Sequence, residues 1–156
     1  MLGHYSKGST VRKPSLRLAE PDDAWVLSRI DQASFRDYLP AGAYRSLIWT
    51  AGLTVRIIRN EMGHSAGLVV TEHRRGYIEI VRLAVRPVDR RCGLATMVLE
   101  TMQRNLPRSC QIIAKIELTG EMIPAIRRFE KLGFFGLPMP ECADVIRFEW
   151  RHPYAG

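Results

Sequence analysis

The chain has 156 residues, 46% of them hydrophobic and 25% charged, which are ordinary values for one globular domain with its own core. No apolar run approaches the roughly 20 residues needed to cross a bilayer, and the polar, basic stretch 1–15 does not resemble a signal peptide, so we expect a cytoplasmic protein. The three cysteines lie far apart, and neither HExxH nor CxxC occurs, which argues against a disulfide framework and against a bound metal.

The net charge of +7 is typical of a protein with a polyanionic partner, such as nucleic acid, an anionic membrane or a phosphate-rich cofactor. Short basic clusters occur at Arg74-Arg75, Arg90-Arg91 and Arg127-Arg128. Composition alone leaves a solvated basic surface and a specific anion site equally open. Because no stacking-aromatic motif or recognition helix accompanies the charge, we do not expect a nucleic-acid partner.

Residues 1–14 are predicted to form a flexible basic arm, because they are rich in Gly, Ser, Thr and Pro. Beyond the arm, alternating or β-branched patterns predict strands at 15–19, 53–58, 66–71, 77–85, 111–116, 134–137 and 145–150. Helical periodicity with start and stop residues predicts helices at 20–34, 41–49, 94–106 and 124–132. The central strand–helix–strand unit implies a parallel strand pair inside a mixed sheet, and we expect a single α/β (α+β) domain over 15–152.

A basic turn that contains glycine, Arg90-Arg91-Cys92-Gly93-Leu94-Ala95, joins a buried strand to a helix. Such a junction presents unpaired backbone N–H groups and the positive end of a helix dipole to one point in space. Gly93 permits a close backbone approach, Ala95 is small, and the two arginines add charge. The turn is therefore suited to a diphosphate, although small residues at a strand–helix junction also serve plain packing.

Two segments resemble the motifs of the GNAT family of N-acetyltransferases. Leu83-Ala84-Val85-Arg86-Pro87, followed by Arg90-x-x-Gly93-x-Ala95, resembles motif A, whose pattern is Arg/Gln-x-x-Gly-x-Gly/Ala. The segment 125–134 resembles motif B, and the order of elements fits from about residue 15 to residue 150. The resemblance implies a mixed, mostly antiparallel sheet of six to seven strands, with a central splayed parallel pair and helices on both faces.

The resemblance also implies acetyl-CoA as co-substrate, with no metal. Pantetheine is peptide-like and would pair with a strand backbone as an added strand, while the diphosphate would lie on the amides of the turn. The implied cofactor-binding residues are Leu83, Ala84, Val85, Arg90, Arg91, Cys92, Gly93, Leu94, Ala95, Thr96 and Phe129.

Acetyl transfer needs a neutral amine, whereas a lysine amine has a pKa of about 10.4 and an α-amino group about 8, so a base helps both. Glu79 is the one acid in an otherwise apolar strand, and its offset from the turn matches the general-base glutamate of the histone-acetyltransferase branch. Burial would raise its pKa towards the working range. The alternative is a structural glutamate paired with a neighbouring arginine. Strict alternation places Arg82 on the opposite side of the strand, whereas a bulge would bring it to the same side.

Phe129 occupies the position at which many relatives carry a tyrosine that protonates the departing thiolate, and Met122 occupies the position of a frequent asparagine. Phenylalanine cannot donate a proton, so either water or another tyrosine does so, or the protein binds acetyl-CoA and turns over slowly. Cys92 lies at a helix start beside arginines, where a thiol pKa can fall. The family transfers the acetyl group directly, so we do not expect an acyl-cysteine.

We therefore predict an N-acetyltransferase that moves the acetyl group of acetyl-CoA to a primary amine by direct attack in a ternary complex. The acceptor can be a protein N-terminus, a lysine or a small-molecule amine, and the chain can be a monomer or a homodimer. The alternative is a non-catalytic or weakly active acetyl-CoA-binding regulatory module. Ser34-Phe35 and the chain length are typical of the ribosomal-protein-alanine N-acetyltransferase branch, but the paired tyrosines of such enzymes are missing, which leaves small-molecule acceptors open.

Overall fold

The structure is a computed structural model that describes residues 12–117 and 123–153. Of the predicted arm, residues 1–11 lie outside the described part of the chain, as does Met122. The strands are β1 (Ser15–Leu18), β2 (Leu53–Arg59), β3 (Ser65–Arg74), β4 (Tyr77–Val85), β5 (Gln111–Glu117), β6 (Phe135–Pro138) and β7 (Val145–Arg151). The helices are α1 (Ala24–Ser34), α2 (Ala41–Trp49), α3 (Leu94–Asn105) and α4 (Ile123–Lys131), with short 3-10 turns η2 (Pro21–Asp23) and η3 (Pro87–Asp89).

The seven strands follow the order β1-β2-β3-β4-β5-β7-β6. β4 and β5 are parallel, whereas β1 with β2, β5 with β7 and β6 with β7 are antiparallel. This mixed sheet with its parallel pair confirms the predicted fold class. The parallel ladder joins Tyr77–Ile80 to Gln111–Ala114, and the splay expected beyond it stays a prediction.

Two element bounds differ from the sequence-based expectation by more than one residue. The first helix was expected from residue 20, but the chain first makes the 3-10 turn η2, in which Glu20 and Asp23 form a capping box. The Glu20 amide donates to Asp23 Oδ2 at 2.7 Å. β3 was expected to end at Thr71 and instead continues to Arg74, because backbone pairing extends a strand through polar residues that carry no hydrophobic signal.

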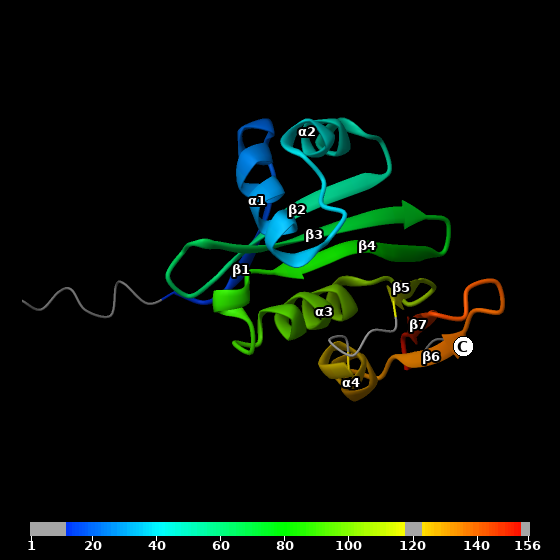
Figure 1. The fold of residues 1–156 in the computed structure, drawn as a ribbon. Helices are drawn as coiled ribbons and strands as arrows, with labels where there is room; N and C mark the ends of the chain where they lie inside the picture. The colour runs from blue at the N-terminus through cyan, green and yellow to red at the C-terminus, as the bar shows by residue number, and fades with distance from the viewer. Residues whose placement is uncertain (1–11, 118–122, 154–156) are drawn as a thin grey trace, which may run out of the picture. The chain divides into compact units, whose positions relative to one another are not determined.

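The described chain forms two compact units, and β3, β4 and α3 each pass from one into the other. The first unit comprises the described residues up to Val70 together with Arg82–Val98. Within it α1 and α2 lie side by side (Figure 1), and α2 packs on β2. They share an apolar core made of Ala24, Leu27, Ile30, Ala41, Tyr44, Val55, Ile57, Leu68, Val70 and Ala84.

The second unit comprises Thr71–Val81 and the described residues from Leu99 onward. Its β5, β7 and β6 are neighbours in the sheet, and α4 contacts β6. The core of this unit contains the buried rings of Phe129, Phe134 and Phe148. None of the described helices has the length and apolarity that a membrane span requires. The single domain over 15–152 and the cytoplasmic location stay predictions.

Candidate functional site

The turn Arg90–Gly93 leads into α3 with two residues in the left-handed region of backbone space. Arg91 has φ 67° and Gly93 has φ 78°. The Gly93 carbonyl accepts from the Met97 amide at 2.9 Å, which makes Gly93 the N-cap of α3. Glycine has no side chain with which to cap a helix. The first three amides of α3, from Leu94 to Thr96, have no partner within the helix and are therefore suited to bind an anion.

Space around this helix start is open. A Cβ atom added to Gly93 would meet nothing within 4 Å, so the backbone angle and not crowding within the protein favours glycine here. Arg91 and Cys92 are exposed, and Cys92 Sγ lies 3.6 Å from the Arg90 carbonyl oxygen. The sequence-predicted diphosphate turn is thus exposed, positively charged and capped by glycine.

Polar contacts within the first unit hold the turn in place. Arg90 Nε donates to the Val85 carbonyl at 2.9 Å, and its Nη2 donates to Ser34 Oγ at 3.2 Å. Arg86 forms an ion pair with Asp89 at 2.6 Å, and Asn60 Nδ2 donates to the other carboxylate oxygen of Asp89 at 3.0 Å. Arg90 therefore fixes the turn to the end of β4 by hydrogen bonds. The Arg91 side chain is exposed and is better placed to reach a phosphate. Both stay predictions as cofactor-binding residues.

The end of β4, where pantetheine is expected to pair, lies close to β3. A Cβ atom at Gly67 would come within 2.4 Å of the Ala84 carbonyl oxygen and 3.3 Å of Val85 Cα. The Arg86 amide donates to the Ala66 carbonyl at 2.7 Å. Sequence reasoning missed Gly67, although a glycine inside an apolar strand is a signal of close backbone approach.

A buried carboxylate in the first unit was also missed. Asp31 on α1 is 0% exposed. Its oxygens accept from Arg82 Nε at 2.6 Å, from Arg82 Nη2 at 3.0 Å and from the Leu39 amide at 3.1 Å, and also from the Tyr44 hydroxyl. The Arg82 guanidinium lies 4.2 Å from the centre of the Phe35 ring. These contacts tie β4, α1, α2 and the α1–α2 loop together.

The same contacts perturb the titration of Tyr44 and Arg82. Burial, followed by the hydrogen bond and the charge of Asp31, raises the pKa of Tyr44 above its usual range. Burial alone would lower the pKa of Arg82, but the hydrogen bond and charge of Asp31 outweigh it and raise that pKa. Arg82 is thus engaged by Asp31, which was not among the partners considered from the sequence.

Glu79 lies on the part of β4 that belongs to the second unit. Its side chain is 24% exposed, and its Oε1 is 3.9 Å from Lys115 Nζ on β5. The sequence alternative was a neighbouring arginine, whereas the structure places a lysine beside it. Because 3.9 Å is an ion-pair distance without a close hydrogen bond, the carboxylate retains acceptor capacity. Its role as a base stays a prediction.

Phe129 belongs to an aromatic cluster in the second unit. It is buried, stacks on Phe148 at a centroid distance of 5.2 Å and meets Phe134 edge-on at 4.9 Å. This packing supports the interpretation of Phe129 as a core residue. Contact between Phe129 and the cofactor stays a prediction.

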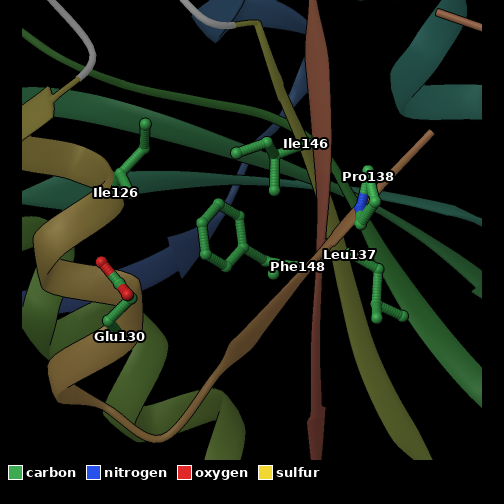
Figure 2. Close-up of a pocket in the computed structure, with 7 residues that line it drawn as sticks. Ile126, Glu130, Leu137, Pro138, Ile146 and Phe148 are labelled. Carbon is green, nitrogen blue, oxygen red and sulfur yellow. The ribbon is translucent and has the colours of Figure 1, made fainter. Parts of the chain in front are cut away.

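Two hollows lie within single units, one in each. Figure 2 shows the hollow of the second unit, where Ile146 and Phe148 of β7 project towards α4. It measures about 260 Å³ and is lined by Ile126, Glu130, Gly136, Leu137, Pro138, Ile146 and Phe148. The hollow of the first unit measures about 390 Å³ and is lined by Trp25, Ser28, Arg29, Gln32, Tyr38, Pro40, Ala41, Gly42 and Arg45. Neither lining includes a sequence-predicted site residue. The described residues contain no group of His, Cys, Asp and Glu that could hold a metal.

The family model of the acetyltransferase (GNAT) family matches residues 23–134, which is most of the chain. The chain belongs to the GNAT acetyltransferase family. This assignment confirms the resemblance seen in motifs A and B, and acetyl-CoA is the acetyl donor of the family. No curated protein matches the chain.

Solved structures of acetyltransferases share the fold. The Escherichia coli ribosomal-protein-S18-alanine N-acetyltransferase has a TM-score of 0.71 at 15% identity, over 92% of this chain and 96% of that one. A putative acetyltransferase from Salmonella typhimurium, solved with its cofactor acetyl-CoA, has a TM-score of 0.72 at 18% identity over 92% and 96%. Arabidopsis thaliana NAA60, in complex with a bisubstrate analogue, has a TM-score of 0.65 at 16% identity over 88% and 97%. At such identities the likeness shows the fold.

Proposed function

We propose that this protein is an acetyl-CoA-dependent N-acetyltransferase that acts on a primary amine by direct attack in a ternary complex. The observation that carries the proposal is the helix start capped by Gly93. It supplies open amides and a positive helix dipole inside the sequence motif that the family uses for the cofactor diphosphate. Arg91 adds a positive charge to the same turn.

In the proposed reaction the acceptor nitrogen attacks the thioester carbonyl carbon, so that a C–N bond forms and the C–S bond breaks. Glu79 takes the proton that the amine must lose, either directly or through one water molecule. A backbone N–H in the segment 83–85 donates to the oxygen on which charge develops. Gly67 supports that segment, because its lack of a Cβ allows β3 to approach the Ala84 carbonyl.

The departing thiolate takes its proton from water in this proposal. Phe129 has no proton to give, and its ring is committed to the cluster with Phe148 and Phe134. The absence of a tyrosine at this position is also what motivates the second candidate, a weakly active acetyl-CoA-binding module. Release of free CoA across a panel of amines and peptides separates the two. Cofactor binding without CoA release for any acceptor would favour the module.

The test of Glu79 is the substitution Glu79→Gln, which keeps the shape of the side chain and removes its ability to take a proton. We expect turnover to fall by at least about tenfold, with acetyl-CoA affinity unchanged. Glu72→Gln is the matched control, because Glu72 is also a strand glutamate in an ion pair, with Arg74 at 2.7 Å. Its turnover should stay within about twofold of the unchanged protein. Near-normal turnover of the Glu79 variant would assign Glu79 a structural role.

A further inference from the structure

Four charged side chains gather on one face of the sheet in the second unit, and we call them the charged face: Glu79, Lys115, Arg147 and Glu149. The register aligns Glu79 with Ile113, and Ile113 in turn with Glu149. Lys115 is aligned with Arg147 on the neighbouring antiparallel strand. Aligned residues on neighbouring strands share a face, as do residues two apart along one strand. All four side chains therefore lie on the same side of the sheet.

Two of these charges have the same sign and lie directly opposite each other. Lys115 and Arg147 are cross-strand neighbours, and like charges in that position destabilise a sheet. Each has a carboxylate at ion-pair distance: Glu79 lies 3.9 Å from Lys115 Nζ, and Glu149 Oε2 lies 3.3 Å from Arg147 Nε. Arg147 Nε nevertheless lacks a hydrogen-bond partner among the described residues. This Nε atom is buried, and the 3.9 Å between Lys115 and Glu79 is too long for a hydrogen bond, so the protein's own carboxylates leave both cations incompletely paired.

Lys115 and Arg147 are also accessible, since their side chains are 44% and 39% exposed. An anionic group bound between them would relieve their mutual repulsion and accept charge-assisted hydrogen bonds from both. Two apolar side chains complete the surface. Leu137 on β6 is aligned with Arg147, and Phe135 is aligned with Glu149, with 40% and 45% of these residues exposed.

We propose that the acceptor carries a carboxylate close to its reactive amine, and that Lys115 and Arg147 bind this carboxylate while Phe135 and Leu137 contact an apolar part of the acceptor. The inference rests on the proposed function, because Glu79, the proposed base, is the ion-pair partner of Lys115. A carboxylate bound at Lys115 places an amine a few bonds away within reach of Glu79. Free α-amino acids and peptides with an acidic residue near the N-terminus share this chemistry.

The first test is binding, which does not depend on turnover. Leucine and leucinamide form a pair in which an uncharged amide replaces the carboxylate, and a peptide with aspartate at its second position is compared with its asparagine counterpart. Each is titrated into the full chain and followed by calorimetry. We expect at least tenfold tighter binding of the carboxylate member in one pair, and the pair that shows it identifies the source. Equal binding within both pairs would overturn the proposal.

Variants then locate the binding site. Arg147→Gln and Lys115→Gln should each reduce the carboxylate preference to below threefold. Arg151→Gln is the matched control, because Arg151 lies on the same face of β7 by alternation and is exposed, and its loss removes the same charge. The preference should survive in this variant. If all three variants reduce it equally, net charge and not the Lys115–Arg147 pair is responsible, and the proposal is wrong.

Turnover separates this inference from the proposed function. The ratio of kcat/KM between the two members of a pair is measured in the unchanged protein and in Arg147→Gln. Dividing the first ratio by the second cancels the different basicity of the two amines. That quotient should exceed about threefold. A carboxylate preference in binding without any CoA release would support the anion site and contradict the acetyltransferase proposal. CoA release without a carboxylate preference would support the acetyltransferase proposal and contradict the anion site.

Discussion

Asp31 provides a sharp test of how the first unit is held together. The substitution Asp31→Asn removes a negative charge that is 0% exposed and that accepts from Arg82 at 2.6 and 3.0 Å, from Leu39 and from Tyr44. The new amide group also presents a donor where the aspartate had an acceptor. Removing one partner of a buried ion pair typically costs about 3–5 kcal/mol, because the other charge is left uncompensated.

Urea unfolding measures this loss directly. A shift of the midpoint with an unchanged slope would report a true change in the free energy of unfolding. For a chain of this size each kcal/mol corresponds to about 2–4 °C in melting temperature. Tyr44→Phe is the graded control, because it removes one hydrogen bond to the carboxylate and keeps the ion pair, at an expected cost of about 1.5–3 kcal/mol.

A double-mutant cycle isolates the pair itself. Arg82→Met alone should also destabilise the protein, but in the Asp31→Asn background its further cost should be smaller, because the partner is already lost. The reasoning is refuted if Asp31→Asn costs less than about 1 kcal/mol, the range of an exposed ion pair. Strict additivity of the two substitutions would equally refute it.

Three further predictions concern the turn, the close strands and pH. Gly93→Ala and its control Gly76→Ala both place a side chain at positive φ, where each should lower the free energy of unfolding by about 1–2 kcal/mol. Only Gly93→Ala should weaken acetyl-CoA binding in calorimetry. If both variants bind acetyl-CoA with equal affinity, the assignment of the turn is wrong. Gly67→Ala forces a Cβ to within 2.4 Å of a backbone oxygen and should lower the free energy of unfolding by about 1–3 kcal/mol in urea, whereas the control Gly42→Ala meets nothing within 4 Å and should not destabilise. The pKa of Tyr44 is raised in the folded state, so Tyr44 contributes stability that is fully present below about pH 10 and is lost as the pH rises further. Above that pH the urea midpoint of the unchanged protein should therefore fall more steeply than that of Tyr44→Phe. Parallel pH profiles of the two proteins would contradict this prediction.

Much of the fold could be predicted because the sequence marks its element ends strongly. β4 and α2 have the predicted bounds, since Gly76 and Pro87 flank the strand and a turn follows the helix at Trp49. The end of β3 could not be predicted. Its last residues, Glu72 to Arg74, are polar and owe their strand conformation to pairing with a neighbour rather than to a hydrophobic pattern.

Parts of the candidate site could likewise be predicted from the sequence, and other parts could not. The turn around Gly93 could be located because its determinants, a glycine and a helix start, are consecutive in the sequence. The Asp31–Arg82 pair could not, because its members are 51 positions apart and meet only through the packing of α1 against β4. The opposition of Lys115 and Arg147 depends on strand register. The hydrophobic pattern excludes a slip of one residue, which would expose the buried face, but it does not exclude a slip of two.

Under the proposed function, the helix start capped by Gly93 binds the diphosphate of the cofactor and no other part of it. Acetyl-CoA and free CoA carry the same diphosphate, so we expect the open amides of α3 to hold substrate and product with similar strength. The turn would then contribute to retention of the spent cofactor as well as to capture of the fresh one. Under the proposed function, the protein would respond to the ratio of acetyl-CoA to CoA around it more than to the concentration of either.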